Sequence, residues 1–300
     1  MSISLATAKN VFAPLFLDFM FKRAFATEKN EQLRSSLINA FLEKYLDAPI
    51  KSTKLLQTVQ SGKTNKHRGA IFDLHCEDTN GNKFIVEMQL ADQEHFISRS
   101  LFYASQTIAN SAKKGKEYNF DLPRVYSLSF LNFEPDICNI NPSIVQHIGL
   151  ADLEKRGIVF PHLHFAFALL PRFNKPLSDC KTMQDLWLYL FLHLHEFDKI
   201  PVKLKNKMFK TLFDTAKIAI FNRDELENYE ATMKYWDDHK AIVAFAKKKA
   251  TAEGMQQGMQ QGMQQGMQQG VQQGVQQGRK EILDLIDKGY SPAKIKNMYK

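Results

Sequence analysis

Residues 71–90, with the sequence IFDLHCEDTNGNKFIVEMQL, decide the fold because they predict a β-hairpin. The runs 71–77 and 83–90 alternate apolar and polar side chains, which is the pattern of strands with one buried face. Their apolar rows are Phe72, Leu74 and Cys76 on the first run, and Phe84, Val86, Met88 and Leu90 on the second. Between the runs lies a polar turn that contains Asn80-Gly81, a pair common in tight hairpins.

The length of this turn decides whether Asp73 and Glu87 lie on one face of the sheet. A two-residue turn at Asn80-Gly81 would pair Asp73 with Met88 and would place the two acids on opposite faces. A three-residue turn with Gly81 in the left-handed conformation places Asp73 directly opposite Glu87. The longer turn also keeps both apolar rows on one face, so we predict it.

This pairing brings two carboxylates about 5 Å apart at their Cβ atoms, a separation that suits a divalent cation. The alternative is that Asp73 and Glu87 are ordinary solvent-side residues of an amphipathic hairpin. Like charges directly opposite on neighbouring strands repel each other unless a cation lies between them. Glu87 also lies in the otherwise apolar run 85–88, which is typical of a covered central strand where an unpaired carboxylate is costly. A functional site is therefore the better interpretation.

Asp73, followed by a hairpin and Glu87-x-Gln89, resembles the PD-(D/E)XK nuclease signature in the variant where Gln replaces Lys. Two further blocks, 18–25 (DFMFKRAF) and 96–103 (FISRSLFY), resemble the opening helix of this family and the helix that follows the Glu-x-Gln strand. In this order, the three blocks resemble the recombination-promoting nuclease (Rpn) family, transposase-like members of the PD-(D/E)XK superfamily. The resemblance covers roughly residues 10–135, and the glycine repeat near the C-terminus adds weaker support.

The resemblance implies a role for each of these residues. Asp73, Glu87 and the backbone carbonyl of Met88 would be metal ligands, and Gln89 would occupy the position of the usual catalytic Lys. Asp18 would approach the metal from the side or orient a bound water, although an acid in a first helical turn also favours the helix dipole. Hard oxygen ligands select Mg²⁺ or Mn²⁺ as the cofactor. Gln can orient a water, but it cannot supply a positive charge.

Further residues are expected to contact a phosphate or the DNA backbone. Arg99 and Tyr103 are one helical turn apart and would face the site to steady a phosphate. A surface Arg and a core-facing Tyr are the alternative interpretation. Lys66 and Arg68 belong to a basic cluster just before the hairpin that could follow a phosphate backbone, or could be an ordinary solvated loop.

The composition is compatible with a DNA-directed protein. The 300 residues carry 40 Lys and Arg against 32 Asp and Glu, giving a net charge of +8, which favours polyanionic partners. The three cysteines show no paired spacing, so we expect a reducing, cytoplasmic environment and no zinc site. Two His-x-His pairs, at 162–164 and 193–195, lie in aromatic runs and indicate packing. No apolar stretch reaches membrane-spanning length.

The order of the expected elements predicts an α/β fold with a mixed sheet. Before the hairpin we expect helices at 14–25 and 31–46 and a strand at 53–60, and after it a helix at 94–114 and a strand at 124–133. The resemblance implies that these form the αβββαβ restriction-endonuclease-like core, residues 1–135. Beyond it, a strand at 159–170 and helices at 183–197, 203–221 and 224–249 predict a mainly helical extension, residues 136–249.

The C-terminal region begins with a tetrapeptide repeat, residues 250–278. Glycine recurs every fourth residue from Gly254 to Gly278, separated by Met-Gln-Gln or Val-Gln-Gln. On a helix this row drifts by about 40° per repeat, so it forms a slanted contact stripe. The repeat is either disordered or a helix stabilised by a second copy, and we favour the helix, which makes a homo-oligomer the expected state. A pair of short helices is expected in residues 279–300, with a break at Gly289.

The resemblance implies a metal-dependent DNA endonuclease that promotes recombination or is associated with mobile elements, and this is the leading hypothesis. Two alternatives remain open. One is a catalytically inert protein that binds DNA and assembles oligomers, which Gln89 keeps open because it replaces the usual Lys. The other is a nuclease of the same chemistry directed at RNA.

Overall fold

The computed structural model describes residues 10–60, 70–91, 94–111, 122–152, 154 and 157–299. The chain divides into two compact units, Met1–Lys234 and Tyr235–Lys300. The first unit runs through residue 135, where a domain boundary was expected, and residues on both sides of it contribute strands to one sheet.

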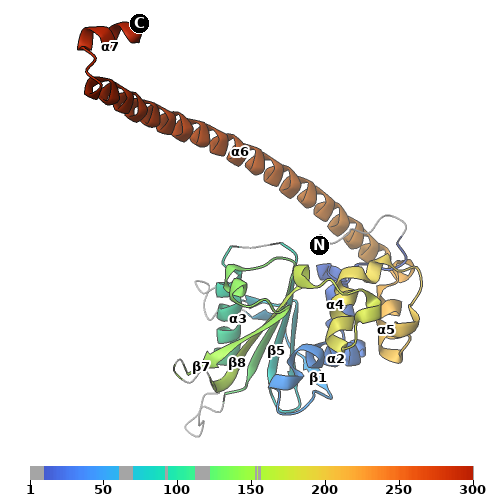
Figure 1. The fold of residues 1–300 in the computed structure, drawn as a ribbon. Coiled ribbons are helices and arrows are strands. Elements are labelled where there is room, and N and C mark those ends of the chain that lie inside the picture. Colours follow the sequence, from blue (N-terminus) through green and yellow to red (C-terminus); the bar gives the residue numbers. More distant parts are fainter. Residues whose placement is uncertain are drawn as a thin grey trace. The chain divides into compact units, whose positions relative to one another are not determined.

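The centre of the first unit is a mixed six-stranded sheet with the order β1-β4-β5-β6-β8-β7 (Figure 1). Its strands are β1 (Thr53–Leu55), β4 (Leu74–Asp78), β5 (Lys83–Gln89), β6 (Val125–Leu131), β7 (Val145–Ala151) and β8 (Ile158–Leu169). Strands β1, β4 and β5 are antiparallel, β5, β6 and β8 run parallel, and β7 returns antiparallel to β8. The short strands β2 (Val59–Gln60) and β3 (Ala70–Ile71) form a separate antiparallel pair. The α/β class with a mixed sheet is therefore confirmed.

Helices cover both faces of the sheet (Figure 1). They are α1 (Asp18–Phe25), α2 (Glu31–Leu42), α3 (Phe96–Ser111), α4 (Met183–His193) and α5 (Lys207–Ala216). Short 3₁₀ turns, Glu43–Tyr45 and Leu194–Glu196, continue α2 and α4. Helix α3 packs on one face, and α2 and α4 pack on the other, with α1 and α5 against α2. The connection through α3 is the crossover that parallel neighbours β5 and β6 require.

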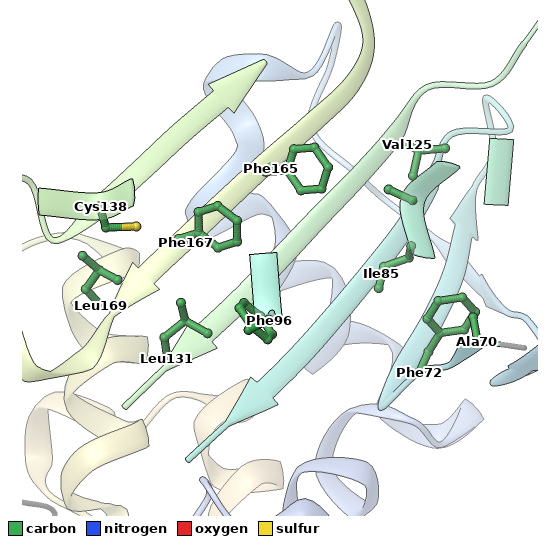
Figure 2. Close-up of a cluster of buried hydrophobic side chains, with 11 residues drawn as sticks. Ala70, Phe72, Ile85, Phe96, Val125, Leu131, Cys138, Phe165, Phe167 and Leu169 are labelled. Carbon is green, nitrogen blue, oxygen red and sulfur yellow. The ribbon is translucent and has the colours of Figure 1, made fainter. Parts of the chain in front are cut away.

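Two aromatic layers hold these helices on the sheet. On the α3 side, Figure 2 shows Phe96 of α3 lying over the sheet among Ile85, Val125, Phe165 and Phe167. On the other side, Phe130 of β6 stacks on Phe191 of α4 at 4.2 Å and meets Phe41 of α2 edge-on at 5.0 Å. Strand β5 lies between β4 and β6 and is covered on both faces. This confirms that the run containing Glu87 is a covered central strand.

The hairpin has the predicted three-residue turn. Leu74 pairs with Val86 in the β4–β5 ladder. At the turn, the Asp78 N–H donates to the carbonyl of Asn82 at 3.1 Å, and Gly81 is left-handed with a φ of +81°. The register predicted from the apolar alternation is therefore confirmed, and it brings Asp73 opposite Glu87.

The alternation places Phe72 on the wrong face of the hairpin. Leu74 and Cys76 form the buried row of β4, but Phe72 belongs to the cluster under α3, together with Ile85 of the opposite face. The reason is that β4 begins at Leu74 and the chain bends at Asp73, so the two-residue period does not extend back to Phe72.

Replacing Gly81 with Val is expected to destabilise the protein by about 1–2 kcal/mol, because an L-residue with a Cβ is strained in the left-handed region. Among the described residues, no atom lies within 4 Å of the added Cβ, so the cost comes from the backbone alone. Urea denaturation measures it, with Gly157→Val as the control at a glycine whose φ is not positive. Equal effects of the two substitutions would contradict the strain argument.

Helix α6 (Arg223–Asp287) contains the whole tetrapeptide repeat and extends from the end of the first unit through the second. It ends where predicted, because Gly289 has a φ of +81° and its N–H donates to the carbonyl of Ile286 at 2.9 Å. A last helix, α7 (Pro292–Met298), follows. None of the described helices is long and apolar enough to cross a membrane.

Candidate active site

Asp73 and Glu87 meet at the end of the hairpin away from the turn. Asp73 lies just before β4. Glu87 lies near the C-terminal end of β5, which is the end farther from the hairpin turn. The Asp73 N–H points to Glu87 Oε1 at 3.4 Å, and the Met88 N–H donates to Asp73 Oδ2 at 3.0 Å. Met88 itself turns its side chain to the opposite, buried face. The hairpin register alone therefore creates a pair of adjacent carboxyl groups.

Both carboxyl groups are largely removed from water. The Asp73 side chain is 16% exposed and Glu87 is 7% exposed. Burial raises the pKa of Asp73 to about 6, against a smaller opposing effect of the Met88 N–H. Burial raises the pKa of Glu87 well above its ordinary value, and the neighbouring charge of Asp73 raises it further. Two ionised carboxylates are thus costly here without a cation beside them.

Gln89 and Arg99 form a chain of hydrogen bonds that ends on this pair. Gln89 Nε2 donates to Glu87 Oε2 at 3.3 Å, and Arg99 Nη2 of α3 donates to Gln89 Oε1 at 3.0 Å. Arg99 also lies over the ring of Phe96, 5.3 Å from its centroid. The structure therefore places Arg99 within the site, where it fixes the orientation of the Gln89 amide.

Tyr103 lines the same narrow crevice as Glu87 and Arg99. Its ring meets Phe72 edge-on at 5.4 Å, so part of the side chain packs on the core cluster. The position fits the interpretation of a core-facing Tyr, and the crevice that the described residues form leaves no room for a water molecule. Its contact with a phosphate stays a prediction.

Asp18 approaches the pair from α1, together with Lys22, which was not predicted as a site residue. Lys22 Nζ lies 2.7 Å from Asp18 Oδ1 and 3.6 Å from Asp73 Oδ1. The charge of Asp18 contributes to the raised pKa of Asp73, which agrees with their closeness. Asp18 is also the first residue of α1, so the helix-dipole interpretation describes its position equally well.

The signal for Lys22 was present in the sequence. Lys22 follows Asp18 by four residues in the block 18–25, which places both side chains on one face of a helix. The distance to Asp73, however, depends on how α1 packs beside the hairpin, and spacing along the chain does not reveal it.

The donor set of the pair fits a hard divalent cation. No group of three or more His, Cys, Asp or Glu side chains that could hold a metal occurs within the described residues. Mg²⁺ in nucleotide and nucleic-acid enzymes is held by one or two carboxylates and takes its remaining ligands from water and phosphate. Two buried, mutually repelling carboxylates match that pattern. Asp73 and Glu87, with the Met88 carbonyl, could therefore hold such an ion.

A cavity of 650 Å³ adjoins the site between α1 and the first turns of α6. Its lining includes Asp18 and Lys22, and also the basic residues Arg23 and Lys29. Arg23 forms an ion pair with Glu225 of α6. Lys66 and Arg68, the other residues expected to contact DNA, lie outside the described residues.

The His-x-His pairs lie elsewhere in the fold. His164 of β8 contacts His147 of β7, with 3.0 Å between the ring nitrogens, and Tyr45 packs on both rings. Burial lowers the pKa of His164 to about 4. These contacts agree with the packing role predicted for this histidine.

A comparison of the sequence with known protein families identifies the family of this chain. The sequence profile described as PD-(D/E)XK nuclease family transposase matches residues 15–246. The chain belongs to this family. The match confirms the resemblance that Asp73, Glu87 and Gln89 carry, and it extends beyond residue 135 to include β7, β8, α4 and α5. No curated protein and no solved structure gives a significant match.

As a PD-(D/E)XK nuclease family transposase, the chain is a member of a nuclease family linked to mobile elements. In the structure Asp73 lies before β4, and Glu87 and Gln89 lie on the covered strand β5. Proteins of this superfamily generally use divalent metals, which agrees with the donor set of the pair.

Proposed function

We propose that the protein is a metal-dependent DNA endonuclease that hydrolyses phosphodiester bonds and promotes recombination or acts with a mobile element. The observation that carries this proposal is the buried Asp73–Glu87 pair in a chain that belongs to a nuclease family. A structural role alone gives no reason to bury two like charges side by side.

The residues of the pair would hold Mg²⁺ or Mn²⁺, with the Met88 carbonyl as a further ligand. When bound, the cation lowers the pKa of a water and offsets the negative charge that builds up on the phosphate. Gln89 then orients a water through its amide, whose direction Arg99 fixes by the 3.0 Å hydrogen bond to Oε1. Arg99 and Tyr103 border the crevice beside Glu87 and are the proposed phosphate contacts on the α3 side.

DNA is the proposed substrate, and a second copy of the chain is the proposed partner. The net charge of +8 favours a polyanion, and Lys66 and Arg68 are proposed to follow its backbone. Self-association through the tetrapeptide repeat is supported by an exposed apolar row on α6. Its members Met255, Met259, Met263 and Met267 are 74–79% exposed.

The purified protein is expected to nick supercoiled plasmid DNA in the presence of Mg²⁺ or Mn²⁺. Cleavage should disappear when a chelator is added, and it should disappear in Glu87→Ala, because that variant lacks one of the two carboxylates. Agarose gels that separate supercoiled, nicked and linear plasmid give the readout, and an RNA of equal length added as competitor tests the RNA alternative.

The matched control is Glu77→Ala, which removes an acid from the same hairpin at the turn end, where Glu77 pairs with Lys83. It should cleave as the wild type does. If folded wild-type protein does not cleave with any of several divalent metals, the proposal is overturned in favour of an inert protein that binds and assembles. Cleavage that persists in Glu87→Ala would place the reaction elsewhere.

A further inference from the structure

The site lacks a charge at the position where the family signature normally has Lys. Gln89 stands there, and its amide hydrogen-bonds to Glu87 and Arg99. A phosphodiester that is being cleaved gains negative charge, and a fixed positive group aimed at that charge is among the strongest contributions a protein can make. Another cation beside the pair would have to supply that charge.

Lys83 lies on the same strand but does not reach the pair. It is at the opposite end of β5, four residues from Glu87, which is about 13 Å along a strand. It also forms an ion pair with Glu77. Arg99 of α3 is the phosphate contact proposed above, and its charge already acts on Glu87, but its guanidinium also donates to the Gln89 amide.

Lys22 is the lysine that lies beside the carboxylates. Its Nζ is 3.6 Å from Asp73 Oδ1, although it comes from α1 and not from β5. Pairing with Asp18 one turn away explains the 2.7 Å contact, since such i,i+4 pairs are common on helices. It does not explain the approach to a buried acid on another element.

Lys22 also reaches the space where a nucleic-acid backbone could lie. Its side chain is 42% exposed and lines the 650 Å³ cavity together with Arg23 and Lys29. The ammonium group therefore has Asp73 on one side and an open cavity on the other, which is lined by three basic residues and by Asp18 and Glu225.

We propose that Lys22 supplies, from helix α1, the positive charge that Gln89 cannot supply, by contacting the phosphate that is cleaved. This inference rests on the proposed nuclease function and assigns a catalytic residue to it. Lys22 acts in this role as a charge and hydrogen-bond donor, and the carboxylate pair and its cation keep the task of activating water.

The test compares single-turnover cleavage of a DNA duplex at saturating Mn²⁺ among Lys22 variants. Lys22→Met and Lys22→Gln should each cleave about 10²-fold more slowly than wild type, because one charge aimed at the transition state is lost. Lys22→Arg should stay within about tenfold of wild type, because it keeps the charge. The double variant Lys22→Met with Gln89→Lys, which moves the lysine to the usual signature position, should regain at least about tenfold.

Lys210→Met is the matched control, since Lys210 is an exposed lysine of α5 that does not line this cavity. Its rate at saturating DNA should change less than about threefold, whatever its effect on affinity. Calorimetric titration of Mn²⁺ into the Lys22→Met variant distinguishes the proposed phosphate contact from a second possible role, which is neutralising the nearby acids. If Lys22 only neutralised Asp73 and Asp18, Lys22→Met would bind Mn²⁺ more tightly and cleave at the wild-type rate.

The outcomes separate this inference from the function on which it rests. A wild type that does not cleave overturns both. A wild type that cleaves, an inactive Glu87→Ala and a fully active Lys22→Met together overturn only the role of Lys22. Folded Lys22→Met and Lys22→Gln that are both slow, with rescue by Arg, are the expected result.

Discussion

Asp73→Asn is expected to reduce metal-dependent cleavage by roughly 10³-fold, and at the same time to make the metal-free protein more stable above pH 6. The loss of activity follows because a bound metal contributes several kcal/mol of charge stabilisation in the transition state, and each 1.36 kcal/mol is about tenfold in rate. Asn offers a neutral oxygen where the ion needs a carboxylate. The gain in stability follows from the pKa of Asp73.

Burial raises the pKa of Asp73 from its ordinary value of 3.8 to about 6 in the folded protein. Between these values the folded state binds a proton that the unfolded chain has already released, so Asp73 costs stability as the pH rises. The ionisation of Asp73 should therefore cost the metal-free protein no stability below about pH 4. The cost should grow as the pH rises through 6. Asn cannot ionise, so it removes that cost.

The expected gain of Asp73→Asn is on the order of 1–2 kcal/mol at pH 8 and near zero at pH 4. Asn retains an oxygen that can accept from the Met88 N–H, and its amide can donate to Glu87, so the local hydrogen bonds survive. The high pKa of Glu87 adds in the same direction, since its repulsion by Asp73 disappears as well.

Urea denaturation with a chelator at pH 4 and pH 8 measures this difference, with Glu77→Gln as the control acid at the turn end of the hairpin. Adding Mn²⁺ at pH 8 should stabilise the wild type and leave Asp73→Asn unchanged, because only the wild type binds the ion tightly. An Asp73→Asn protein that is equally destabilised at both pH values would show that the carboxylate stabilises the fold, which contradicts this prediction.

The position of the carboxylate pair could be predicted from the sequence because it depends on local features only. The two-residue period of the strands and the three-residue turn with Gly81 fix which residues face each other. No knowledge of the rest of the fold is needed to place Asp73 beside Glu87. The same pattern fails at Phe72, one residue beyond the bend, where the chain leaves the strand.

Features that depend on packing between distant segments could not be predicted in this way. Strand β7 was not expected, because its apolar pattern is interrupted and its pairing with β8 contains register shifts around Gly149 and Leu150. Its identity as a strand comes from the partner β8. Lys22 likewise becomes part of the site only because α1 packs beside the hairpin.

Arg34 is the buried residue that fixes α1 in this position, and sequence periodicity gave no indication of it. It lies on α2 between Leu33 and Ser35 and is fully buried. Its guanidinium donates to Thr53 Oγ1 at 2.8 Å and to the Thr53 carbonyl at 3.0 Å. It also donates to the carbonyls of Phe25, at 2.9 Å, and Thr27, at 3.1 Å. One side chain thus joins the end of α1, the turn after it and strand β1.

Arg34→Met is expected to destabilise the protein by about 3–4 kcal/mol, which is the largest loss that we predict for a single substitution. Met has a similar length, so the cost comes mainly from carbonyls that lose their donor in a buried place, each costing about 1–3 kcal/mol. Relief from burying a charged guanidinium offsets part of this cost. Arg34→Lys should lose less, because it keeps the charge and some of the hydrogen bonds.

Chemical denaturation measures the loss, with Arg223→Met as the control. The Arg223 side chain is 91% exposed and forms an ion pair with Glu227, one turn further along α6. That control should change the stability by less than about 0.5 kcal/mol. A loss below about 1 kcal/mol in Arg34→Met would mean that the carbonyls find other donors. Because α1 carries Asp18 and Lys22, Arg34→Met should also slow cleavage at temperatures where it is still folded. Lys22→Arg in the same background should then restore little, since the missing element is the position of the helix and not its charge.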